Sequence, residues 1–449
     1  MVLPCNDPDT IAAIATAQGR GGVGVVRVSG RNIKKIGNGI LGKLPAARHA
    51  TYCKFLDNNG GVLDQGIVLY FPAPHSYTGE EVFELQGHGG PAVLQMLLQR
   101  CLDLGARLAQ PGEFTRRAFL NNKLDLAQAE SVADLIDANT AEAARSAVRT
   151  LTGEFSAAIN ALVEGIIYLR MLVEAMLDFP EEQVGIVDFK QRDALLNDIL
   201  LKLHRTLDSA KQGSLLREGA HVVIAGQPNV GKSSLLNRLS GEAAALVSEI
   251  PGTTRDVIRQ AIQIRGVPLH IMDTAGLRES QDVVENMGIA RTRETMDCAD
   301  LILLLLDASK GLTDKDEAII AELRADIPRL LVFNKIDLIK DKTRLMARNN
   351  HFVAVSAKTG EGLEDLREKL LEAVGWRNQE SGSFMARERH LRALALAQTH
   401  LDQAHAIRTS AELFAEELRL AQRALNEITG EFTADDLIGE IFSRFCIGK

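Results

Sequence analysis

The stretch Gly226–Ser234, which reads GQPNVGKSS, decides the fold of this chain. It matches the phosphate-loop pattern GxxxxGK[ST] in the setting that this loop requires. The apolar run Val222–Ala225 predicts a strand that enters the loop, and Ser234–Leu239 predicts a helix that leaves it. Such a loop points consecutive backbone N–H groups at a phosphate, and the dipole of the following helix also favours an anion. The stretch therefore predicts a nucleotide site.

The polar side chains of this loop have separate predicted roles. Lys232 is expected to reach the β- and γ-phosphates, and the Ser233 hydroxyl is expected to ligate Mg²⁺. A glycine-rich turn that arose by chance is the alternative, and the motifs further along the chain argue against it. The loop residues expected to contact the nucleotide are Asn229, Val230, Gly231, Lys232, Ser233 and Ser234.

Three further segments follow in the order found in GTP-binding domains. The first is a predicted strand that ends at Asp273, which provides a carboxylate for Mg²⁺. The other two follow predicted strands and resemble the guanine-reading elements of GTPases, with Asp337 accepting from the N1 and N2 donors of the base. Adenine presents the opposite polarity, so the motifs predict GTP as the substrate. The residues expected to contact GTP here are Asp273, Thr274, Ala275, Gly276, Asn334, Lys335, Asp337, Ser356, Ala357 and Lys358.

Composition and charge limit the possible classes. The chain has 449 residues, of which 46% are hydrophobic and 4% aromatic, so we expect about three domains and Ala/Leu-rich helices beside a sheet. A net charge of −8 provides no bulk attraction to nucleic acid, so RNA contact needs a local patch. Arg116–Arg117 and the pair Arg145/Arg149 are candidates, although a solvated helix face is the simpler interpretation of each.

Cysteine usage and hydropathy predict a cytoplasmic protein. The five cysteines are scattered, form no CxxC pattern and follow no secretory segment. The fully apolar run Leu301–Leu306 fits a strand buried on both faces of a parallel sheet and is far too short to span a membrane. The end Cys446–Lys449 imitates a prenylation box, but its glycine and lysine fit that signal poorly, and we expect no lipid anchor.

Four segments of different character succeed one another along the chain. Residues 1–121 alternate predicted strands with Gly/Pro/Asn turns, which is typical of a small α+β domain. Residues 122–216 and 377–449 show helical periodicity, and residues 217–376 hold the nucleotide motifs. Neither helical flank alone promises a complete core. We therefore predict an α/β and α multidomain protein in which a Ras-like P-loop GTPase domain interrupts one helical domain.

Local patterns in the first segment support this division. Strands are predicted at Gly24–Val28, Val68–Phe71 and Val82–Leu85, and a helix begins at Pro91. A GxGxxG pattern also begins at Gly19, but a strand rather than a helix follows it, which argues against dinucleotide binding.

Five segments outside the phosphate loop are distinctive: Gly19–Gly24, Glu84–Gly90, Pro111–Phe119, Gly252–Asp256 and Cys446–Lys449. With the nucleotide motifs, they make the chain resemble the MnmE (TrmE) family of tRNA-modifying GTPases over essentially its whole length. The resemblance implies a homodimer built through the N-terminal domain and a one-carbon donor, 5-formyltetrahydrofolate or a related reduced folate. It also implies a flavoprotein partner, MnmG (GidA), with which such proteins install a carboxymethylaminomethyl or aminomethyl group on C5 of the wobble uridine of certain tRNAs.

The resemblance also assigns residues outside the nucleotide site. The positions that correspond to folate contacts are Arg27, Glu84, Lys123 and Lys449, and Cys446 corresponds to the family's C-terminal cysteine, which is expected to act in tRNA modification. A folate has a pterin rich in donors and acceptors and an anionic tail, so a carboxylate and several cations are sensible ligands. From the residues alone, Arg27 and Lys123 could also be surface residues, and Cys446 could be a packing residue. For His88, which lies between two glycines, a structural role is a simpler interpretation than a catalytic one.

Hydrolysis needs groups that the motifs do not supply. Leu277 stands where Ras-like enzymes place the glutamine that orients water, and no arginine finger is identifiable. The resemblance favours Glu285 for orienting water, although a carboxylate there also suits the start of a helix. It further implies a K⁺ ion held by Asn229, Ser248, Ile250 and Thr253, with Thr254 on Mg²⁺. The loop expected to contact GTP comprises Ser248, Glu249, Ile250, Pro251, Gly252, Thr253 and Thr254.

Two other classes share the nucleotide motifs. A ribosome-assembly or signalling GTPase would have the same loop, but such proteins usually carry a basic RNA-binding module, and none is recognisable here. A GTP-operated scaffold would leave the modification chemistry to its partner. Folate binding by the purified protein separates the first class from a tRNA-modifying GTPase, and modification with and without the partner bears on the second.

Overall fold

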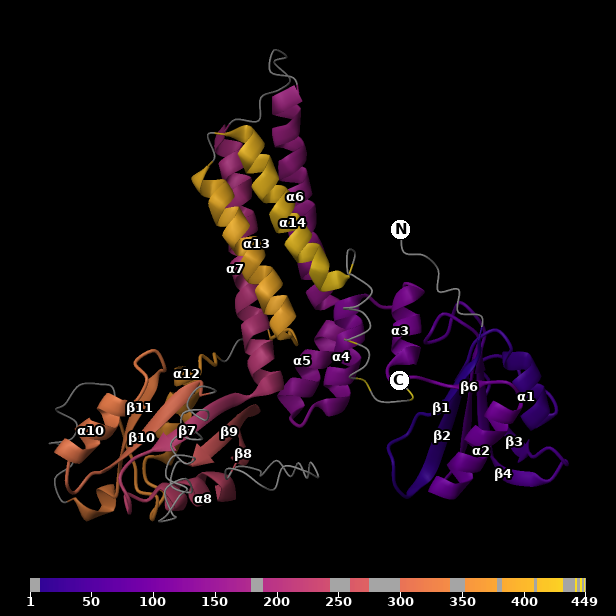
Figure 1. Cartoon of the computed structure of the whole chain (residues 1–449), viewed down its shortest axis with the longest axis horizontal. Helices are drawn as coiled ribbons and strands as arrows, with labels where there is room; N and C mark the ends of the chain where they lie inside the picture. Colours follow the sequence, from indigo (N-terminus) through magenta and orange to yellow (C-terminus); the bar gives the residue numbers. More distant parts are fainter. Residues whose placement is uncertain are drawn as a thin grey trace, which may run out of the picture. The chain divides into compact units, whose positions relative to one another are not determined.

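The computed structural model describes residues 9–178, 189–242, 259–273, 299–339, 352–377, 382–407 and 410–430, with Ile441, Phe445 and Gly448 near the end of the chain. The chain divides into two compact units, whose elements are labelled in Figure 1. The first unit comprises residues 1–133, 150–200 and 396–449. The second comprises residues 134–149 and 201–395.

The first unit contains a six-stranded sheet with the strand order β3-β4-β5-β2-β1-β6. Its neighbouring strands are antiparallel, except that β6 runs parallel to β1. The strands are β1 (Ile11–Ile14), β2 (Gly21–Ser29), β3 (Thr51–Leu56), β4 (Val62–Phe71), β5 (Val82–Gly89) and β6 (Arg107–Leu108). The three strands and the proline-started helix predicted in this region are confirmed.

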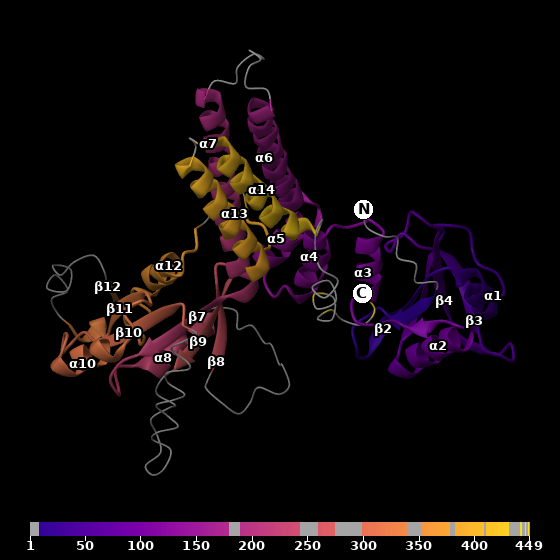
Figure 2. The ribbon, with the colours of Figure 1, turned by 45° about the horizontal axis from the view of Figure 1, so that its top comes forward.

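Helices cover this sheet unequally. Helices α1 (Ile33–Leu41) and α2 (Pro91–Asp103) pack on one face, where Val26 and Leu85 belong to a fully buried core (Figure 2). Helix α3 (Glu113–Leu120) packs on the other face, with Phe114 in a second cluster beside β1. Because successive residues of a strand point to opposite faces, the sequence alternates between these two environments.

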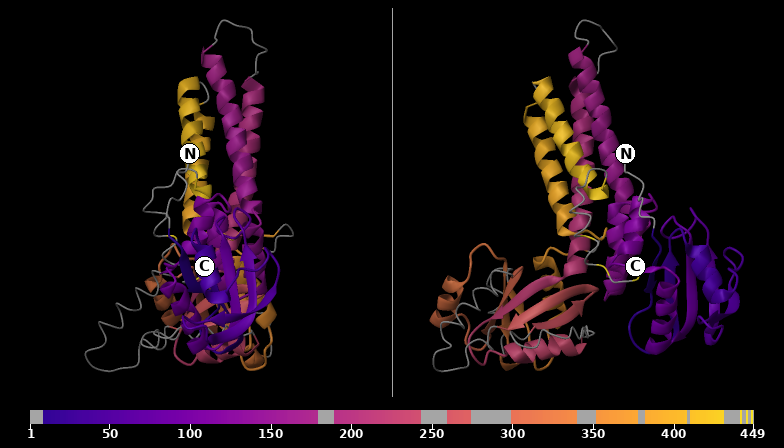
Figure 3. Two further views of the ribbon diagram at one scale, coloured as in Figure 1. Left: turned by 90° about the vertical axis from the view of Figure 1, so that its right-hand side faces the viewer. Right: turned by 45° about the vertical axis from the view of Figure 1, so that its right-hand side comes forward.

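Long helices form the rest of the first unit and continue into the second. Helix α6 packs along α14, and the buried residues of α14 recur at three- and four-residue steps, as the periodicity predicted (Figure 3). The helices are α4 (Leu126–Asp137), α5 (Ala141–Leu151), α6 (Glu154–Asp178), α7 (Phe189–Glu218), α13 (Glu388–Ala406) and α14 (Ala411–Thr429).

One segment of α6, Glu154–Ala175, is long and apolar enough to cross a membrane by length and composition alone. The core helix of a helical bundle meets the same criterion. In α6, Phe155, Ile159 and Ile166 are fully buried, and the helix packs against α14. One face of the helix is thus packed, whereas Ile167, Tyr168 and Met171 are 46%, 46% and 54% exposed.

The second unit contains a six-stranded sheet with the order β12-β11-β10-β7-β9-β8. It is parallel except for the edge strand β8, which is antiparallel to β9. Every residue of β10 is buried, as the apolar run predicted. The strands are β7 (Ala220–Ala225), β8 (Arg259–Ile264), β9 (Val267–Asp273), β10 (Leu301–Asp307), β11 (Arg329–Asn334) and β12 (Phe352–Ala354).

Helices cover both faces of this sheet. Helices α8 (Lys232–Glu242) and α12 (Leu363–Ala373) contribute to one buried cluster, whereas α10 (Asp314–Glu322) packs against the other. Both clusters contain alternating residues of β10, which explains why the whole strand is apolar. In such a sheet, ligands bind at the carboxyl ends of the parallel strands. The nucleotide motifs lie at these ends.

Candidate functional site

Three residues of the phosphate loop have positive φ values, a backbone conformation that glycine and asparagine adopt more readily than other residues. Gly226 and Gly231 have φ values of +146° and +99°, and Asn229 has a φ of +63°. A Cβ atom on Gly231 would lie 2.3 Å from Nδ2 of Asn334, and one on Gly226 would lie 2.4 Å from the carbonyl oxygen of Leu305. Glycine is therefore needed both for the conformation and for the close approach of neighbouring strands.

Asn334 joins the phosphate loop to the last guanine-reading segment. Its side-chain nitrogen donates to the carbonyl oxygen of Val230 at 2.8 Å, and its side-chain oxygen accepts from the backbone N–H of Ala357 at 2.9 Å. The residue is only 2% exposed. The buried amide of Asn334 thus both donates and accepts a hydrogen bond, and it connects its own segment with the phosphate loop and with the segment of Ala357.

Lys335 makes a second connection. Its ammonium group donates to the carbonyl oxygen of Asn229 and to Oδ2 of Asp307, each at 2.8 Å. Burial alone would raise the pKa of Asp307, but hydrogen bonds from Lys335 and Ser309 outweigh it and lower the pKa. Asp307 therefore stays ionised and anchors Lys335 beside the loop.

The remaining base-reading residues also lie together. The Ser356 hydroxyl donates to Oδ1 of Asp337 at 2.7 Å, and Ser356 is fully buried. Asp337 lies in the short helix η2 (Ile336–Leu338), directly after β11. Lys358 is exposed one residue beyond Ala357. The carboxylate is thus oriented by a neighbouring segment, as an acceptor for a base should be.

The residues predicted to bind phosphate lie at the start of α8. Lys232 is 8% exposed, and its ammonium group donates to the carbonyl oxygens of Gly226 and Gln227. Ser233 and Ser234 are exposed in the first turn of α8. Asp273 ends β9 and is paired in register with Ile224, two residues before the loop. The two residues predicted to ligate Mg²⁺ thus lie in α8, which follows β7, and at the end of β9, which pairs with β7.

Several predicted residues lie outside the part of the chain that the structure describes, and their assignments stay predictions. They are Ser248, Glu249, Ile250, Pro251, Gly252, Thr253, Thr254, Thr274, Ala275, Gly276, Glu285, Cys446 and Lys449.

In the first unit, Arg27 and Glu84 form a direct pair. They are opposite each other in the register of β2 and β5, and Nε of Arg27 donates to Oε1 of Glu84 at 2.9 Å. The guanidinium carbon lies 5.4 Å from the ring centre of Tyr77 and 5.7 Å from that of Phe114. Two aromatic rings and a carboxylate therefore fix the cation in a half-buried setting.

The loop 72–81 connects this pair to Lys123. It carries Tyr77, and the carbonyl oxygen of its Pro74 accepts from the ammonium group of Lys123 at 3.2 Å. Asn121 donates to the carbonyl oxygen of Thr78 in the same loop. Three of the four residues predicted to contact folate are thus linked through one loop and one strand pair.

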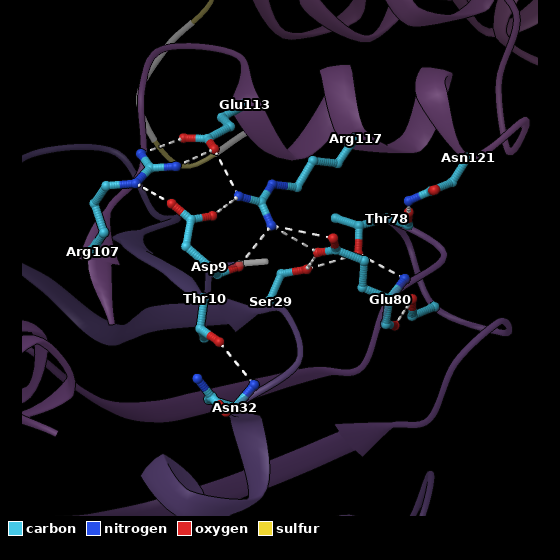
Figure 4. A network of polar contacts seen from close by, with 11 residues as sticks. Asp9, Thr10, Ser29, Asn32, Thr78, Glu80, Arg107, Glu113, Arg117 and Asn121 are labelled. Carbon is cyan, nitrogen blue, oxygen red and sulfur yellow. Dashed lines mark hydrogen bonds and ion pairs between the residues drawn. The ribbon is translucent and has the colours of Figure 1, made fainter. Parts of the chain in front are cut away.

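A buried ion network fixes that loop against α3 (Figure 4). Arg117 is 1% exposed and donates to carboxylate oxygens of Asp9, Glu80 and Glu113. Arg107 binds Asp9 and both oxygens of Glu113. The prediction of a solvated helix face is therefore wrong for Arg117, because three carboxylates compensate the burial of its charge. Its neighbour Arg116 is exposed, as predicted.

The end of the chain returns to the same domain. Ile441 and Phe445 pack with Phe119 and Leu126 in one buried cluster. Gly448 is buried, with a φ of +104°, and a Cβ atom there would lie 2.3 Å from the carbonyl oxygen of Ile14. Only glycine fits at this position, and β1 is paired with the strand that carries Arg27.

Some residues of the nucleotide site were not predicted from the sequence. Asp307 anchors Lys335, and Gln227 donates to Thr313 and Asp316 at the start of α10. The only signal for Asp307 was its position directly after the apolar run Leu301–Leu306, at the end of a predicted strand, a place where functional carboxylates often occur in α/β sheets. Gln227 occupies a variable position of the loop pattern and had no signal.

This fold and these contacts define a P-loop GTPase domain joined to an α+β domain and a helical domain. Two protein-family models match the chain: one described as "GTP-binding protein TrmE N-terminus" over residues 10–123, and one as "MnmE helical domain" over residues 126–446. The chain belongs to the MnmE family. The second match alone covers more than half of it.

Relatives agree with this assignment over nearly the full length. The tRNA modification GTPase MnmE of Nitrosospira multiformis is 59% identical over 98% of this chain and 99% of its own. The protein of the same name from Thiobacillus denitrificans is 60% identical, covering 98% of both chains. The comparison with solved structures also matches Era of Aquifex aeolicus bound to GDP·AlF4⁻, at 27% identity and a TM-score of 0.29, over only 40% of this chain and 66% of that one.

Proposed function

We propose that this chain is a Mg²⁺-dependent and K⁺-stimulated GTPase that modifies C5 of the wobble uridine in certain tRNAs. A reduced folate serves as the one-carbon donor, and the flavoprotein MnmG (GidA) is the partner. The observation that carries the GTPase part is the contact of Asn334 with both Val230 and Ala357, which holds the phosphate-binding and base-reading segments in one site. The family membership supports the tRNA part.

The test of this function is the tRNA of cells that lack the chain. Their wobble uridines should lose the C5 aminomethyl-type group, and the wild-type gene should restore it. Lys232→Ala should fail to restore it, because the loop would lose the cation that neutralises the transferred phosphate. Unchanged tRNA in the deletion strain would refute the proposed function.

Magnesium and potassium fit the described residues to different extents. For Mg²⁺, exposed Ser233 stands at the first turn of α8, and Asp273 ends the strand paired with β7. For K⁺, the exposed residue Asn229 of the loop offers an amide oxygen, which is a suitable ligand for a hard monovalent cation. We assign Ser248, Ile250 and Thr253 to K⁺, Thr254 to Mg²⁺ and Glu285 to water orientation by resemblance.

The folate proposal rests on the pair Arg27–Glu84. A pterin offers adjacent donors and acceptors, which a carboxylate and a guanidinium can bind, and the anionic tail suits Lys123 and Lys449. Gly448 lies against Ile14, the residue next to Ala13, which is the register partner of Arg27, and Lys449 is the next residue in the sequence. Calorimetry with 5-formyltetrahydrofolate tests this binding.

A homodimer is supported by the uncovered part of the N-terminal sheet. Tyr52 and Ile67 are paired in register and are 67% and 41% exposed. Strand pairing continues this row through Gln86 to Val25 on the face that also bears Arg27. An apolar sheet face of this kind suits a second copy of the chain. Tyr52→Asp should shift the molecular mass measured by light scattering toward that of the monomer.

Cys446 is proposed to act in tRNA modification and not in GTP hydrolysis, because nothing in the nucleotide site needs a thiol. Cys446→Ser should then retain GTPase activity and lose modification. Full modification by this variant would assign Cys446 to packing. We place the reaction in the cytoplasm, where tRNA is modified and cysteines stay reduced.

A further inference from the structure

His88 and Asp64 form a hydrogen-bonded pair on neighbouring strands of the N-terminal sheet. Nδ1 of the His88 ring lies 2.7 Å from Oδ1 of Asp64, and the backbone N–H of His88 donates to Oδ2 of Asp64 at 2.8 Å. The His88 side chain is 70% exposed, whereas that of Asp64 is 9% exposed. One shielded carboxylate thus holds one exposed imidazole by two contacts.

The surrounding glycines make room for this pair. A Cβ atom on Gly87 would lie 2.4 Å from Oδ2 of Asp64, and one on Gly66 would lie 2.1 Å from the carbonyl oxygen of Gln86. Any side chain at position 87 would therefore displace the carboxylate. Burial alone would raise the pKa of Asp64, but the hydrogen bonds from His88 outweigh it and lower the pKa, so the carboxylate stays ionised.

This geometry decides which ring nitrogen is free to act. A carboxylate accepts hydrogen bonds, so Nδ1 of His88 carries the hydrogen and the lone pair resides on Nε2. Histidine is the side chain best suited to exchange a proton near neutral pH, and a carboxylate on Nδ1 stabilises the imidazolium that forms. The pair therefore has the arrangement of a general base and its orienting group.

The position of the pair connects it to the proposed folate site. His88 follows Glu84 by four residues on β5, about 13 Å along the strand at a rise of about 3.3 Å per residue. Asp64 is the charged group that faces it from β4. The part of β2 opposite His88 is Gly21–Gly24, which has no charged side chain. On β3, the exposed Lys54 is the register partner of Gln65.

We propose that His88, held by Asp64, is the general base that activates the amine incorporated into the uridine; this inference rests on the proposed function. An ammonium or alkylammonium ion has no free lone pair until an N–H bond breaks. The proton passes to Nε2, where an N–H bond forms and the imidazolium pairs with Asp64. The neutral amine keeps the electron pair of the broken bond and is thereby nucleophilic.

The decisive variant is His88→Gln in the full chain, assayed with the flavoprotein partner, GTP, reduced folate and ammonium or glycine. Glutamine can still donate to Asp64 but cannot accept the proton, so modification should slow by roughly 10²- to 10⁴-fold. GTP hydrolysis and folate binding should stay at wild-type values. The wild-type rate should rise with pH, because only an unprotonated base can accept the proton, and this rise should be absent from the variant.

His49→Gln is the matched control, because His49 is an exposed histidine of the same domain and should leave rate and pH profile unchanged. A second measurement is independent of activity: ¹⁵N NMR should show the Nδ1–H tautomer for His88, lost in Asp64→Asn. Wild-type modification by His88→Gln, or an Nε2–H tautomer, would overturn the inference. Failure of the wild type to modify tRNA at any pH would remove the proposed function and this inference together.

Discussion

The side-chain nitrogen of Asn334 donates a hydrogen bond to the carbonyl oxygen of Val230, which joins a residue predicted to read the base directly to the phosphate loop. Asn334→Ala would leave that carbonyl and the N–H of Ala357 without their buried partner. We expect the free energy of unfolding to fall by about 2–4 kcal/mol, since each unsatisfied group costs about 1–3 kcal/mol. Urea unfolding measures this change. Asn237→Ala, at an exposed position of α8, should change it by less than about 0.5 kcal/mol.

Asp337 should determine the choice of base. Its carboxylate is oriented by the Ser356 hydroxyl and is proposed to accept from the N1 and N2 donors of guanine. Asp337→Asn exchanges one acceptor for a donor, so the affinity for GTP should fall at least about tenfold, while that for XTP rises. Competition binding with the two nucleotides measures both changes. Unchanged affinities would show that the guanine assignment is wrong.

The nucleotide site was largely predictable because its chemistry is local. The phosphate loop needs a strand, two glycines and a helix within a dozen residues, and all of these can be read from the sequence around Lys232. The contact from Lys335 to Asp307 joins residues 28 positions apart and depends on neighbouring strands in the sheet. No local pattern encodes such a contact.

The N-terminal domain shows the opposite case. Strands β2, β4 and β5 were predictable from alternation, but the ion network around Arg117 was not. A buried arginine and an exposed one have the same local sequence signal, and Asp9 reaches Arg117 across 108 positions. Arg27 and Glu84 became candidates only through the family resemblance, although they are direct register partners. The domain boundaries at 121, 216 and 376 stay a prediction.

The carboxyl groups bound to Arg107 and Arg117 should determine how the N-terminal domain unfolds in acid. Burial alone would raise the pKa of Glu113 and of Asp9, but hydrogen bonds from Arg107 and Arg117 outweigh it, so both values are lowered. Carboxyls with a depressed folded-state pKa add stability above about pH 4, and this stability is lost as pH falls through the folded-state values. Circular dichroism during acid titration should therefore show the unfolding midpoint of Glu113→Gln at a higher pH than wild type.

Replacement of Arg117, the cation at the centre of this network, should lower the stability of the protein more than replacement of Glu113. Arg117→Ala would leave Asp9, Glu80 and Glu113 without their shared partner, and breaking a buried pair costs about 3–5 kcal/mol. Thermal unfolding at pH 7 measures the loss. The exposed neighbour offers the control, because Arg116→Ala should leave the melting temperature within about 2 °C of wild type. Equal melting temperatures for the two variants would contradict a stabilising role for the network.

The pair Arg27–Glu84 should determine folate affinity. Arg27→Ala removes a charge-assisted hydrogen bond and leaves Glu84 unpaired, so the Kd for 5-formyltetrahydrofolate should rise by about 10- to 100-fold. Isothermal titration calorimetry measures this change, and Arg31→Ala, an exposed arginine near the end of the same strand, should not alter it. GTP hydrolysis should be unaffected in both variants. Absence of binding heat for wild type with any reduced folate would remove the folate proposal.

Hydrolysis should depend on potassium. Leu277 stands where a water-orienting glutamine would be, and no arginine finger is recognisable in the sequence, so another cation must meet the charge of the transition state. The rate in KCl should exceed the rate in NaCl at equal ionic strength, a comparison that excludes simple screening. Asn229→Ala should abolish the difference, because the loop then loses the side-chain oxygen proposed to hold the ion.

Since the carbonyl oxygen of Asn229 also accepts from Lys335, the backbone contact should survive this substitution, and nucleotide affinity in NaCl should remain near that of wild type. Equal rates of wild type in the two salts would rule out the cation mechanism.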